Sequence, residues 1–357
     1  MKTIVLTGGG TAGHVMPNAA LIPKLRAEGW NIHYIGSADG IEREIIGAIP
    51  DVPYHAVSAG KLRRYADIRN LRDPFRVLAG LAQSWRLLGQ IRPDVIFSKG
   101  GYVSVPVVVA GRLRGIPSVI HESDITPGLA NRLAMPFAKH ICVTFPETLA
   151  RLPEGKATLV GSPIREELFS GSAERGRALC GFSAERPVLL VMGGSLGSQT
   201  INRALRECLD ELLRQFQVIH ICGKANLDPR LDGLPGYRQF EFVGGDLAHL
   251  MAAADLAVSR AGANAIFEFL ALRIPMLLIP LSLKASRGDQ ILNAESFRRS
   301  GYSRVLSEEE LSKETLLREI LRLYGERSVY LDRMKASPVG GAADRILELI
   351  RGTAGKK

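Results

Sequence analysis

The chain is poor in cysteine and has no long hydrophobic run. Its 357 residues include four cysteines, none spaced as a zinc pair, which excludes a disulfide framework and favours a reducing, cytoplasmic setting. One lysine and a few apolar residues precede the first glycines, unlike a secretory signal. No apolar run approaches the ~20 residues that span a bilayer. We therefore expect a protein that is soluble or bound only at a membrane surface.

The chain also has fewer acidic residues than basic ones. The sequence holds 46 Lys and Arg against 36 Asp and Glu, a formal net charge of +10. This balance favours an anionic partner, which is nucleic acid, an acidic membrane surface or a phosphorylated substrate. The length predicts two domains, because single cores rarely grow beyond roughly 250 to 300 residues.

Short apolar runs alternate with helical segments in both halves. This alternation predicts an α/β fold of two Rossmann-like, doubly wound parallel sheets. A break at 161–165 gives a first domain of residues 1–162 and a second of residues 163–340, and the helical segment 341–357 is expected to return to the first. The expected strands are 3–6, 31–36, 94–98, 118–121, 140–144, 158–160, 187–192, 217–222, 240–243, 256–259, 276–280 and 303–306.

The first glycine-rich turn follows the first expected strand. Gly8, Gly10 and Gly13 fit the dinucleotide pattern G-x-G-x-x-G. A dinucleotide also needs an acid after the second strand, where the chain has Ile35-Gly36-Ser37. The turn more generally predicts a phosphate site at a helix N-terminus, with a plain tight turn as the alternative.

A second glycine-rich turn, Gly193-Gly194-Ser195-Leu196-Gly197, fits the nucleophile elbow of hydrolases. An elbow needs a later acid and histidine, for which only His220 and His249 are available, and no oxyanion-loop motif precedes it. We favour a second phosphate loop in which the Ser195 hydroxyl donates to an anion.

Other polar residues also follow expected strands. Gly262 opens a helix whose second turn carries Glu268, a carboxylate that can accept two hydrogen bonds from a ribose diol or lie on the surface. His14 and His121 lie at the carboxyl edge of the first sheet, where a histidine suits proton transfer near neutral pH or has a structural role.

Residues 61–92 form the most basic stretch, with eight basic and two acidic residues and a net charge of +6. Asp73-Pro74 predicts a helix start. The apolar arc of this helix is wide enough for core packing or for contact with an anionic membrane surface. It consists of Phe75, Val77, Leu78, Leu81, Ala82, Trp85 and Leu88.

Six motifs occur together and in order along nearly the whole chain. They are Gly9-Gly10-Thr11-Ala12-Gly13-His14, Gly100-Gly101-Tyr102-Val103-Ser104, His121-Glu122-Ser123, Gly161-Ser162-Pro163-Ile164-Arg165, Gly193-Gly194-Ser195 and residues 262–268. With them the chain resembles the MurG-type UDP-N-acetylglucosamine transferases of bacterial peptidoglycan synthesis.

This resemblance implies a GT-B fold and an inverting transfer of N-acetylglucosamine from UDP-N-acetylglucosamine to the muramyl 4-hydroxyl of an undecaprenyl-diphosphate-linked acceptor. It implies a peripheral enzyme on the cytoplasmic side of an anionic cell membrane, with no nucleic-acid partner and no cofactor. The sequence itself requires no metal ion, because no Asp-x-Asp stands in a plausible metal loop.

The resemblance also implies roles for individual residues. His14 is the first candidate for the general base, or an acceptor-diphosphate contact, and Glu122 is the second candidate base. The implied donor contacts are Thr11, Ala12, Gly13, Arg165, Ser195 and Gln290, with Val243 at uracil, Ala263 and Asn264 near the diphosphate and Glu268 on the ribose.

Two positions depart from the family pattern. Many members have His-Glu-Gln-Asn where this chain has His121-Glu122-Ser123-Asp124, which leaves the role of Asp124 open. Many also have Gln-Gln or His-Gln at Asp289-Gln290, so only Gln290 carries over. The alternatives are another GT-B UDP-sugar enzyme, such as a lipid glycosyltransferase or a UDP-sugar epimerase, a dinucleotide-binding oxidoreductase, and a non-catalytic nucleic-acid-binding module.

Overall fold

The computed structural model describes residues 1–60, 73–194, 197–337 and 340–355. The chain divides into two compact units, one made of Met1–Pro163 with Gly341–Lys357 and the other of Ile164–Gly340. The sequence placed this boundary after residue 162. No helix of the described ranges is both long enough and apolar enough to cross a bilayer.

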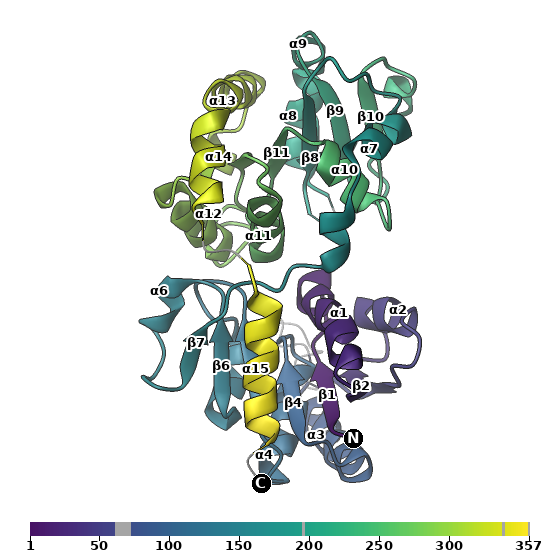
Figure 1. The fold of residues 1–357 in the computed structure, drawn as a ribbon, viewed down its shortest axis with the longest axis vertical. Coiled ribbons are helices and arrows are strands. Elements are labelled where there is room, and N and C mark those ends of the chain that lie inside the picture. Colours follow the sequence, from purple (N-terminus) through teal and green to yellow (C-terminus); the bar gives the residue numbers. More distant parts are fainter. Residues whose placement is uncertain (61–72, 195–196, 338–339, 356–357) are drawn as a thin grey trace. The chain divides into compact units, whose positions relative to one another are not determined.

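A parallel sheet forms the centre of the first unit (Figure 1). Its seven strands in the described ranges run in the order β3-β2-β1-β4-β5-β6-β7. The strands are β1 (Thr3–Thr7), β2 (Asn31–Gly36), β3 (Tyr54–Ala56), β4 (Val95–Ser98), β5 (Ser118–Glu122), β6 (His140–Val143) and β7 (Ala157–Leu159).

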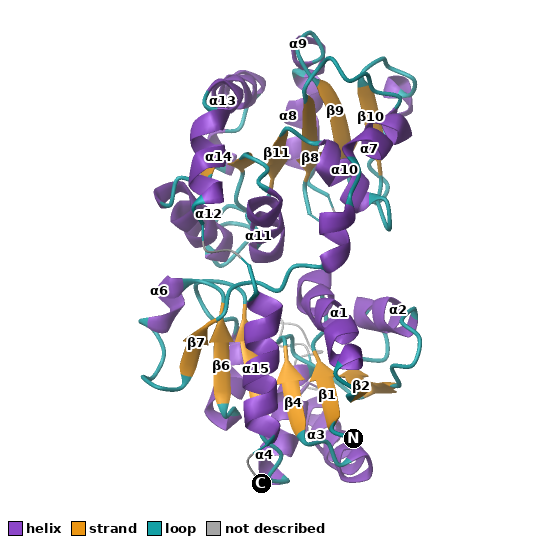
Figure 2. Ribbon diagram, viewed as in Figure 1, coloured by secondary structure: helices purple, strands orange, loops and turns teal. Residues whose placement is uncertain are grey.

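Helices cover both faces of this sheet (Figure 2). Ile4 and Leu6 of β1 belong to one core, with α1 and α15, while Val5 between them belongs to the other, with α3 and α4. Burial on both faces explains why β1 reads as a continuous apolar run. The helices are α1 (Ala12–Ala27), α2 (Ile41–Gly47), α3 (Asp73–Ile91), α4 (Ser104–Leu113), α5 (Leu129–Ala134), η2 (Met135–Phe137), α6 (Pro146–Leu149) and α15 (Ala342–Ala354).

The second unit repeats this plan with six strands in its described residues, in the order β10-β9-β8-β11-β12-β13. The strands are β8 (Val188–Met192), β9 (Gln217–Ile221), β10 (Tyr237–Phe240), β11 (Leu256–Ser259), β12 (Met276–Leu278) and β13 (Ser303–Val305). The helices are η3 (Glu166–Ser170), α7 (Ala173–Cys180), α8 (Gln199–Glu207), α9 (Leu209–Leu212), η4 (Pro229–Leu231), α10 (Leu247–Ala253), α11 (Ala263–Leu272), α12 (Asp289–Arg299), η5 (Glu308–Glu310), α13 (Lys313–Gly325) and α14 (Arg327–Lys335).

The expected α/β fold of two parallel sheets is confirmed, but two strands differ from the prediction. The strand expected at 240–243 was wrong: β10 ends at Phe240, and the apolar residues after it lie in a loop where Phe242 is 75% exposed. β3 was missed because its three residues, Tyr-His-Ala, carry no apolar run. Both strands lie at sheet edges, where only weak patterning is needed.

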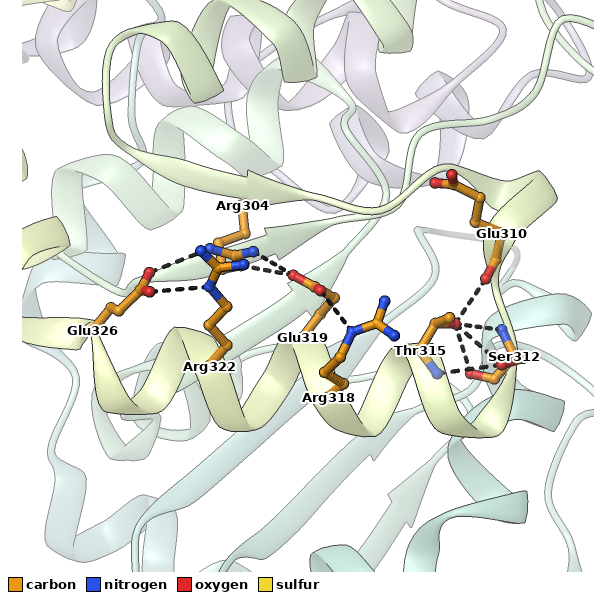
Figure 3. Close-up of polar contacts among 8 residues, drawn as sticks. All are labelled: Arg304, Glu310, Ser312, Thr315, Arg318, Glu319, Arg322 and Glu326. Carbon is orange, nitrogen blue, oxygen red and sulfur yellow. Dashed lines mark hydrogen bonds and ion pairs between the residues drawn. The ribbon is translucent and has the colours of Figure 1, made fainter.

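Figure 3 shows how α13 is fixed against β13. The Arg304 guanidinium on β13 donates to Glu319 (2.8 Å from Nε) and to Glu326 (3.2 Å from Nη1), both on the α13 side. At the other end of the helix, Ser312 and Thr315 form a reciprocal capping box. Charge pairs and a cap therefore hold the two ends of α13.

Each sheet has a point at which the strand order reverses, between β1 and β4 in the first unit and between β8 and β11 in the second. The glycine-containing loops after these four strands are the ones that the sequence singled out. Open parallel sheets bind ligands at the carboxyl ends of strands beside such a point. The fold thus places the predicted loops where a ligand site is expected in each unit.

Candidate active site

Two glycine turns pack backbone against backbone at the carboxyl edge of the first sheet. The Gly9 amide donates to the Gly100 carbonyl at 3.3 Å. Gly101 has a φ of +86°, and a Cβ there would collide with the Gly9 backbone, so no other residue fits. The turns after β1 and β4 therefore form one continuous rim.

Glu42 on α2 holds the first of these turns, although no sequence motif pointed to this residue. Its buried carboxylate accepts the amides of Gly10 and Ser37, each at 3.0 Å, and the Ser37 hydroxyl at 2.6 Å. Burial by itself would raise the pKa of Glu42, but these hydrogen bonds outweigh it and the pKa is lowered. The ionised Glu42 carboxylate therefore already accepts the hydrogen bond of the Gly10 amide, and a bound phosphate must use other donors.

The N-terminus of α1 begins directly after this turn. Thr11 is its N-cap residue but makes no side-chain cap, and the first turn contains no acidic residue. The Thr11 hydroxyl instead lies 3.1 Å from His14 Nδ1. Thr11, Ala12, Gly13 and His14 thus lie together at one helix end, with a partial positive charge and an oriented imidazole.

Glu122 ends β5, one residue beyond the expected strand 118–121, and its carboxylate organises the following loop. Oε1 accepts the Asp124 amide at 3.0 Å, and Oε2 accepts the Gly128 amide at 3.0 Å and the Asn131 side chain at 2.9 Å. The residue is 4% exposed. Protein donors therefore engage both carboxylate oxygens, and this geometry favours a structural role for Glu122 in the loop over that of a base.

A cavity of about 520 Å³ opens beside the first turn. It runs from Gly9 and Gly10 to Arg76 near the start of α3, so it joins the glycine rim to that end of the helix. Other residues of its wall are Ser37, Asp39, Glu42 and Tyr102.

In the second unit, other protein groups already make hydrogen bonds to part of the turn after β8. Ser195 lies outside the described residues, so its predicted role has no structural account. Ser198 caps α8 by accepting the Ile201 amide at 3.4 Å, and it also accepts a hydrogen bond from Arg260 at 2.8 Å. Arg260 pairs with Glu308, whose Oε2 accepts the Ser282 amide at 3.1 Å. This largely buried pair, which the sequence did not reveal, ties together the four loops that follow β8, β11, β12 and β13.

Arg165 and Glu268, predicted separately, form an ion pair. Arg165 Nε and Nη2 both lie 3.2 Å from Glu268 Oε1, and none of the described residues contacts Oε2. Burial raises the pKa of Glu268, and the guanidinium of Arg165 offsets only part of that rise. One oxygen is therefore anchored and the other can accept a hydroxyl.

The remaining predicted donor contacts occupy the carboxyl edge of the second sheet. Ala263 and Asn264 open α11, whose N-cap Gly262 provides no side-chain cap. Gln290 begins the first turn of α12 with Asp289, and its Oε1 accepts the Leu281 amide at 3.2 Å, which directs its NH₂ group away from that loop. Val243 lies in the loop after β10 rather than in a strand.

The nucleophile-elbow alternative fails on its histidines. His220 is fully buried between Tyr237 and Asn202, at 2.8 and 2.9 Å, and burial lowers its pKa to about 3. His249 accepts the Ser172 amide at 3.0 Å. Each histidine has a structural partner and neither serves a serine nucleophile.

Comparisons with known proteins agree with this arrangement. Residues 4–143 match the glycosyltransferase family 28 N-terminal domain and residues 188–348 match its C-terminal domain. The chain has the GT-B fold of nucleotide-sugar glycosyltransferases. It is 60% identical, over 353 residues and 99% of both chains, to a UDP-N-acetylglucosamine--N-acetylmuramyl-(pentapeptide) pyrophosphoryl-undecaprenol N-acetylglucosamine transferase of Geobacillus thermodenitrificans. The chain belongs to this transferase family, as the sequence motifs indicated.

Similarity to solved structures establishes the fold but does not distinguish between the enzyme activities found on that fold. The crystal structure of Acinetobacter baumannii MurG superposes with a TM-score of 0.77 at 24% identity and covers 99% of this chain and 100% of that one. A putative UDP-N-acetylglucosamine 2-epimerase from Listeria monocytogenes reaches a TM-score of 0.71 at 14% identity, with 100% and 98% covered. The choice between transferase and epimerase therefore rests on sequence identity.

Proposed function

We propose that this protein transfers N-acetylglucosamine from UDP-N-acetylglucosamine to the muramyl 4-hydroxyl of an undecaprenyl-diphosphate-linked acceptor. The observation that carries the proposal is full-length identity of 60% to a relative named for this reaction. The positions of His14, Glu268 and Gln290 at the carboxyl edges of the two sheets support it.

The second unit binds the donor. Backbone amides of Ala263 and Asn264 at the uncapped start of α11 face the diphosphate, and the helix end offsets its charge. Glu268 Oε2 accepts a ribose hydroxyl while Arg165 holds the other oxygen. The Gln290 NH₂ group donates to the sugar, and the backbone beside Val243 contacts uracil.

The first unit binds the acceptor and provides the base. The acceptor hydroxyl oxygen attacks the anomeric carbon, the bond from that carbon to the UDP oxygen breaks, and the configuration inverts. The hydroxyl proton passes to His14, and UDP leaves with the bonding electron pair. Thr11 orients the imidazole through its contact with Nδ1.

Ligand-induced stabilisation tests the donor assignment. UDP and UDP-N-acetylglucosamine are expected to raise the melting temperature, and the rise should grow with the logarithm of ligand concentration over Kd, because they bind only the folded chain. NAD, NADP and nucleic acid are expected to leave it unchanged. Stabilisation by NAD or by nucleic acid without an effect of UDP would contradict the proposal.

A peripheral position on the cytoplasmic face of an anionic membrane completes the proposal. On α3, Phe75, Leu78 and Trp85 are 74%, 62% and 41% exposed, which is unusual for side chains so large. Arg114 stacks on the Trp85 ring at 4.2 Å and adds positive charge beside it. Exposed aromatic rings flanked by arginines suit the interface of an anionic bilayer. The cavity at Arg76 then leads from this surface toward the glycine rim.

A further inference from the structure

A lysine is buried directly before the Gly100-Gly101 turn. Lys99 follows β4 and is 1% exposed. Its Nζ lies 2.5 Å from His121 Nδ1 and also contacts Ser123 Oγ. The other titratable groups that act on it are Glu122 at the end of β5, Asp124 in the loop that follows, and the thiol of Cys142 from β6. Burial of an ammonium is costly, so the contacts of Lys99 indicate what it does.

The ammonium fixes the tautomer of His121. An ammonium can only donate, so Nδ1 of the imidazole accepts and carries no hydrogen. The hydrogen is then on Nε2, which lies 2.9 Å from the Gly161 carbonyl oxygen, a group that can only accept. Burial and the Lys99 charge both lower the pKa of His121, which keeps the ring neutral.

The same ammonium determines where the Ser123 hydroxyl can point. Because Lys99 donates to Ser123 Oγ, the serine hydrogen must be directed elsewhere. Lys99 is the only described residue that contacts this hydroxyl, and Ser123 is partly exposed. β5 pairs with β4, so Ser123 lies one strand from the rim formed by the two glycine turns. The result is a polarised O–H group, backed by a buried positive charge, at the ligand edge of the sheet.

We propose that Ser123 is a substrate-contacting hydrogen-bond donor and that Lys99 is the positioning residue that turns its hydroxyl outward. The proposal rests on the proposed transferase function. The group that the Ser123 hydroxyl contacts is an electron-rich substrate oxygen: a sugar hydroxyl, an amide carbonyl or a phosphate oxygen. The acceptor and the donor sugar both carry such oxygens, and kinetics separate the two sources.

Steady-state kinetics of S123A and K99M test the contact. Each variant is expected to lower kcat/KM for one substrate by about three- to ten-fold, the usual effect of one hydrogen bond. A change for the acceptor assigns the oxygen to the acceptor, and a change for UDP-N-acetylglucosamine assigns it to the donor. The double variant should be no worse than the poorer single variant, because both remove one interaction. T126A, which removes a hydroxyl of the same loop outside this cluster, is the matched control.

The pH profile separates this role from a structural one. Burial lowers the pKa of Lys99 to about 8, although Glu122 and Asp124 oppose the shift. Above that pH the neutral amine can accept the Ser123 hydrogen and turn the hydroxyl inward. Wild-type kcat/KM should therefore show a decline above about pH 8 that S123A lacks. An S123A variant with wild-type constants for both substrates, or with the decline intact, would overturn the proposal.

A spectroscopic measurement tests Lys99 without relying on turnover. With ¹⁵N-labelled histidine, the His121 Nδ1 signal should be that of a nitrogen accepting a hydrogen bond from an ammonium in the wild type and should shift in K99M, because the Gly161 carbonyl keeps the hydrogen on Nε2 in both proteins. The same signals in both proteins would overturn the positioning role, whereas failure of the wild type to transfer sugar would count against the proposed function.

Discussion

At the scale of single residues, the account depends on His14 as the base and on the pair of Glu268 with Arg165. His14 is one of two histidines that the sequence placed at the first sheet edge. The structure shows that the two have different surroundings. The other, His121, is buried between Lys99 and a carbonyl and has no access to substrate. His14 is only half-buried and is oriented by a hydroxyl.

Replacement of His14 by alanine is expected to lower kcat by roughly 10²-fold or more, the usual contribution of a general base. Affinity for UDP-N-acetylglucosamine should stay near wild type, because most of the proposed donor contacts belong to the second unit. The measurement is kcat together with a binding isotherm for the donor. Nearly unchanged turnover with intact donor affinity would contradict the assignment of the base.

The proposed contact of Glu268 with ribose predicts a pH dependence of donor binding. Its pKa is raised above the ordinary 4.5, so the carboxylate takes up a proton at a higher pH than an exposed glutamate does. The protonated form loses both the Arg165 pairing and an acceptor for ribose. Donor affinity should therefore fall as the pH is lowered, beginning above 4.5.

Binding isotherms across this pH range check the prediction with two variants. E268Q should bind the donor weakly and show no such pH dependence. E167Q removes the other carboxylate near Arg165, a largely exposed one at 3.7 Å, and should keep the wild-type profile. A wild-type profile in E268Q would contradict the role of Glu268.

At the scale of elements, α3 shows how one apolar arc can serve two surfaces. Leu88 is buried and Leu81 is partly buried, and both join the core under α3 and α4. Phe75, Leu78 and Trp85 from the same arc point outward. The sequence left both core packing and membrane contact open for the whole helix. The structure shows which residues pack in the core and which are exposed.

The exposed side of α3 predicts lipid binding. Replacing Phe75 and Trp85 by serine should weaken binding to vesicles that contain phosphatidylglycerol by about ten-fold or more, since each ring contributes about 1.5 to 3 kcal/mol when removed from water. Vesicle sedimentation measures this effect. The control F169S removes a phenylalanine that is 59% exposed from η3 in the second unit and should bind normally. Vesicle binding that survives loss of both aromatic side chains would contradict the membrane assignment.

The cap of α13 predicts a stability effect without a functional one. Ser312 accepts the Thr315 amide at 3.2 Å, and S312A should cost about 1 kcal/mol of unfolding free energy. S312N, which keeps a capping oxygen, should cost much less. Urea unfolding followed by circular dichroism is the measurement, and equal stability of the wild type and S312A would show that the cap contributes nothing.

At the scale of the whole molecule, the sequence was most informative where local signals were strong. The long apolar strands, the glycine turns and the helix start at Asp73 were all visible in the chain. The edge strands β3 and β10 were not, since so few of their residues are buried. Glu42, Lys99 and the pair of Arg260 with Glu308 escaped prediction because each acts on groups brought near only by folding.

The order of motifs along the chain identified the family, which local physics alone left open. A G-x-G-x-x-G turn and a G-x-S-x-G turn each suit several classes of enzyme. Their histidine and acid partners decide among these classes, and partners lie far away in sequence. His220, for example, reads as a possible triad member until its contacts with Tyr237 and Asn202 are known.

The central claim is tested most directly by incubating the protein with labelled UDP-N-acetylglucosamine and a short-chain, lipid-linked muramyl acceptor. The account predicts a β-linked N-acetylglucosamine on the muramyl 4-hydroxyl, with one UDP released for each disaccharide formed and no turnover without acceptor. Conversion of UDP-N-acetylglucosamine to another UDP-sugar in the absence of acceptor, with no disaccharide formed in its presence, would contradict it.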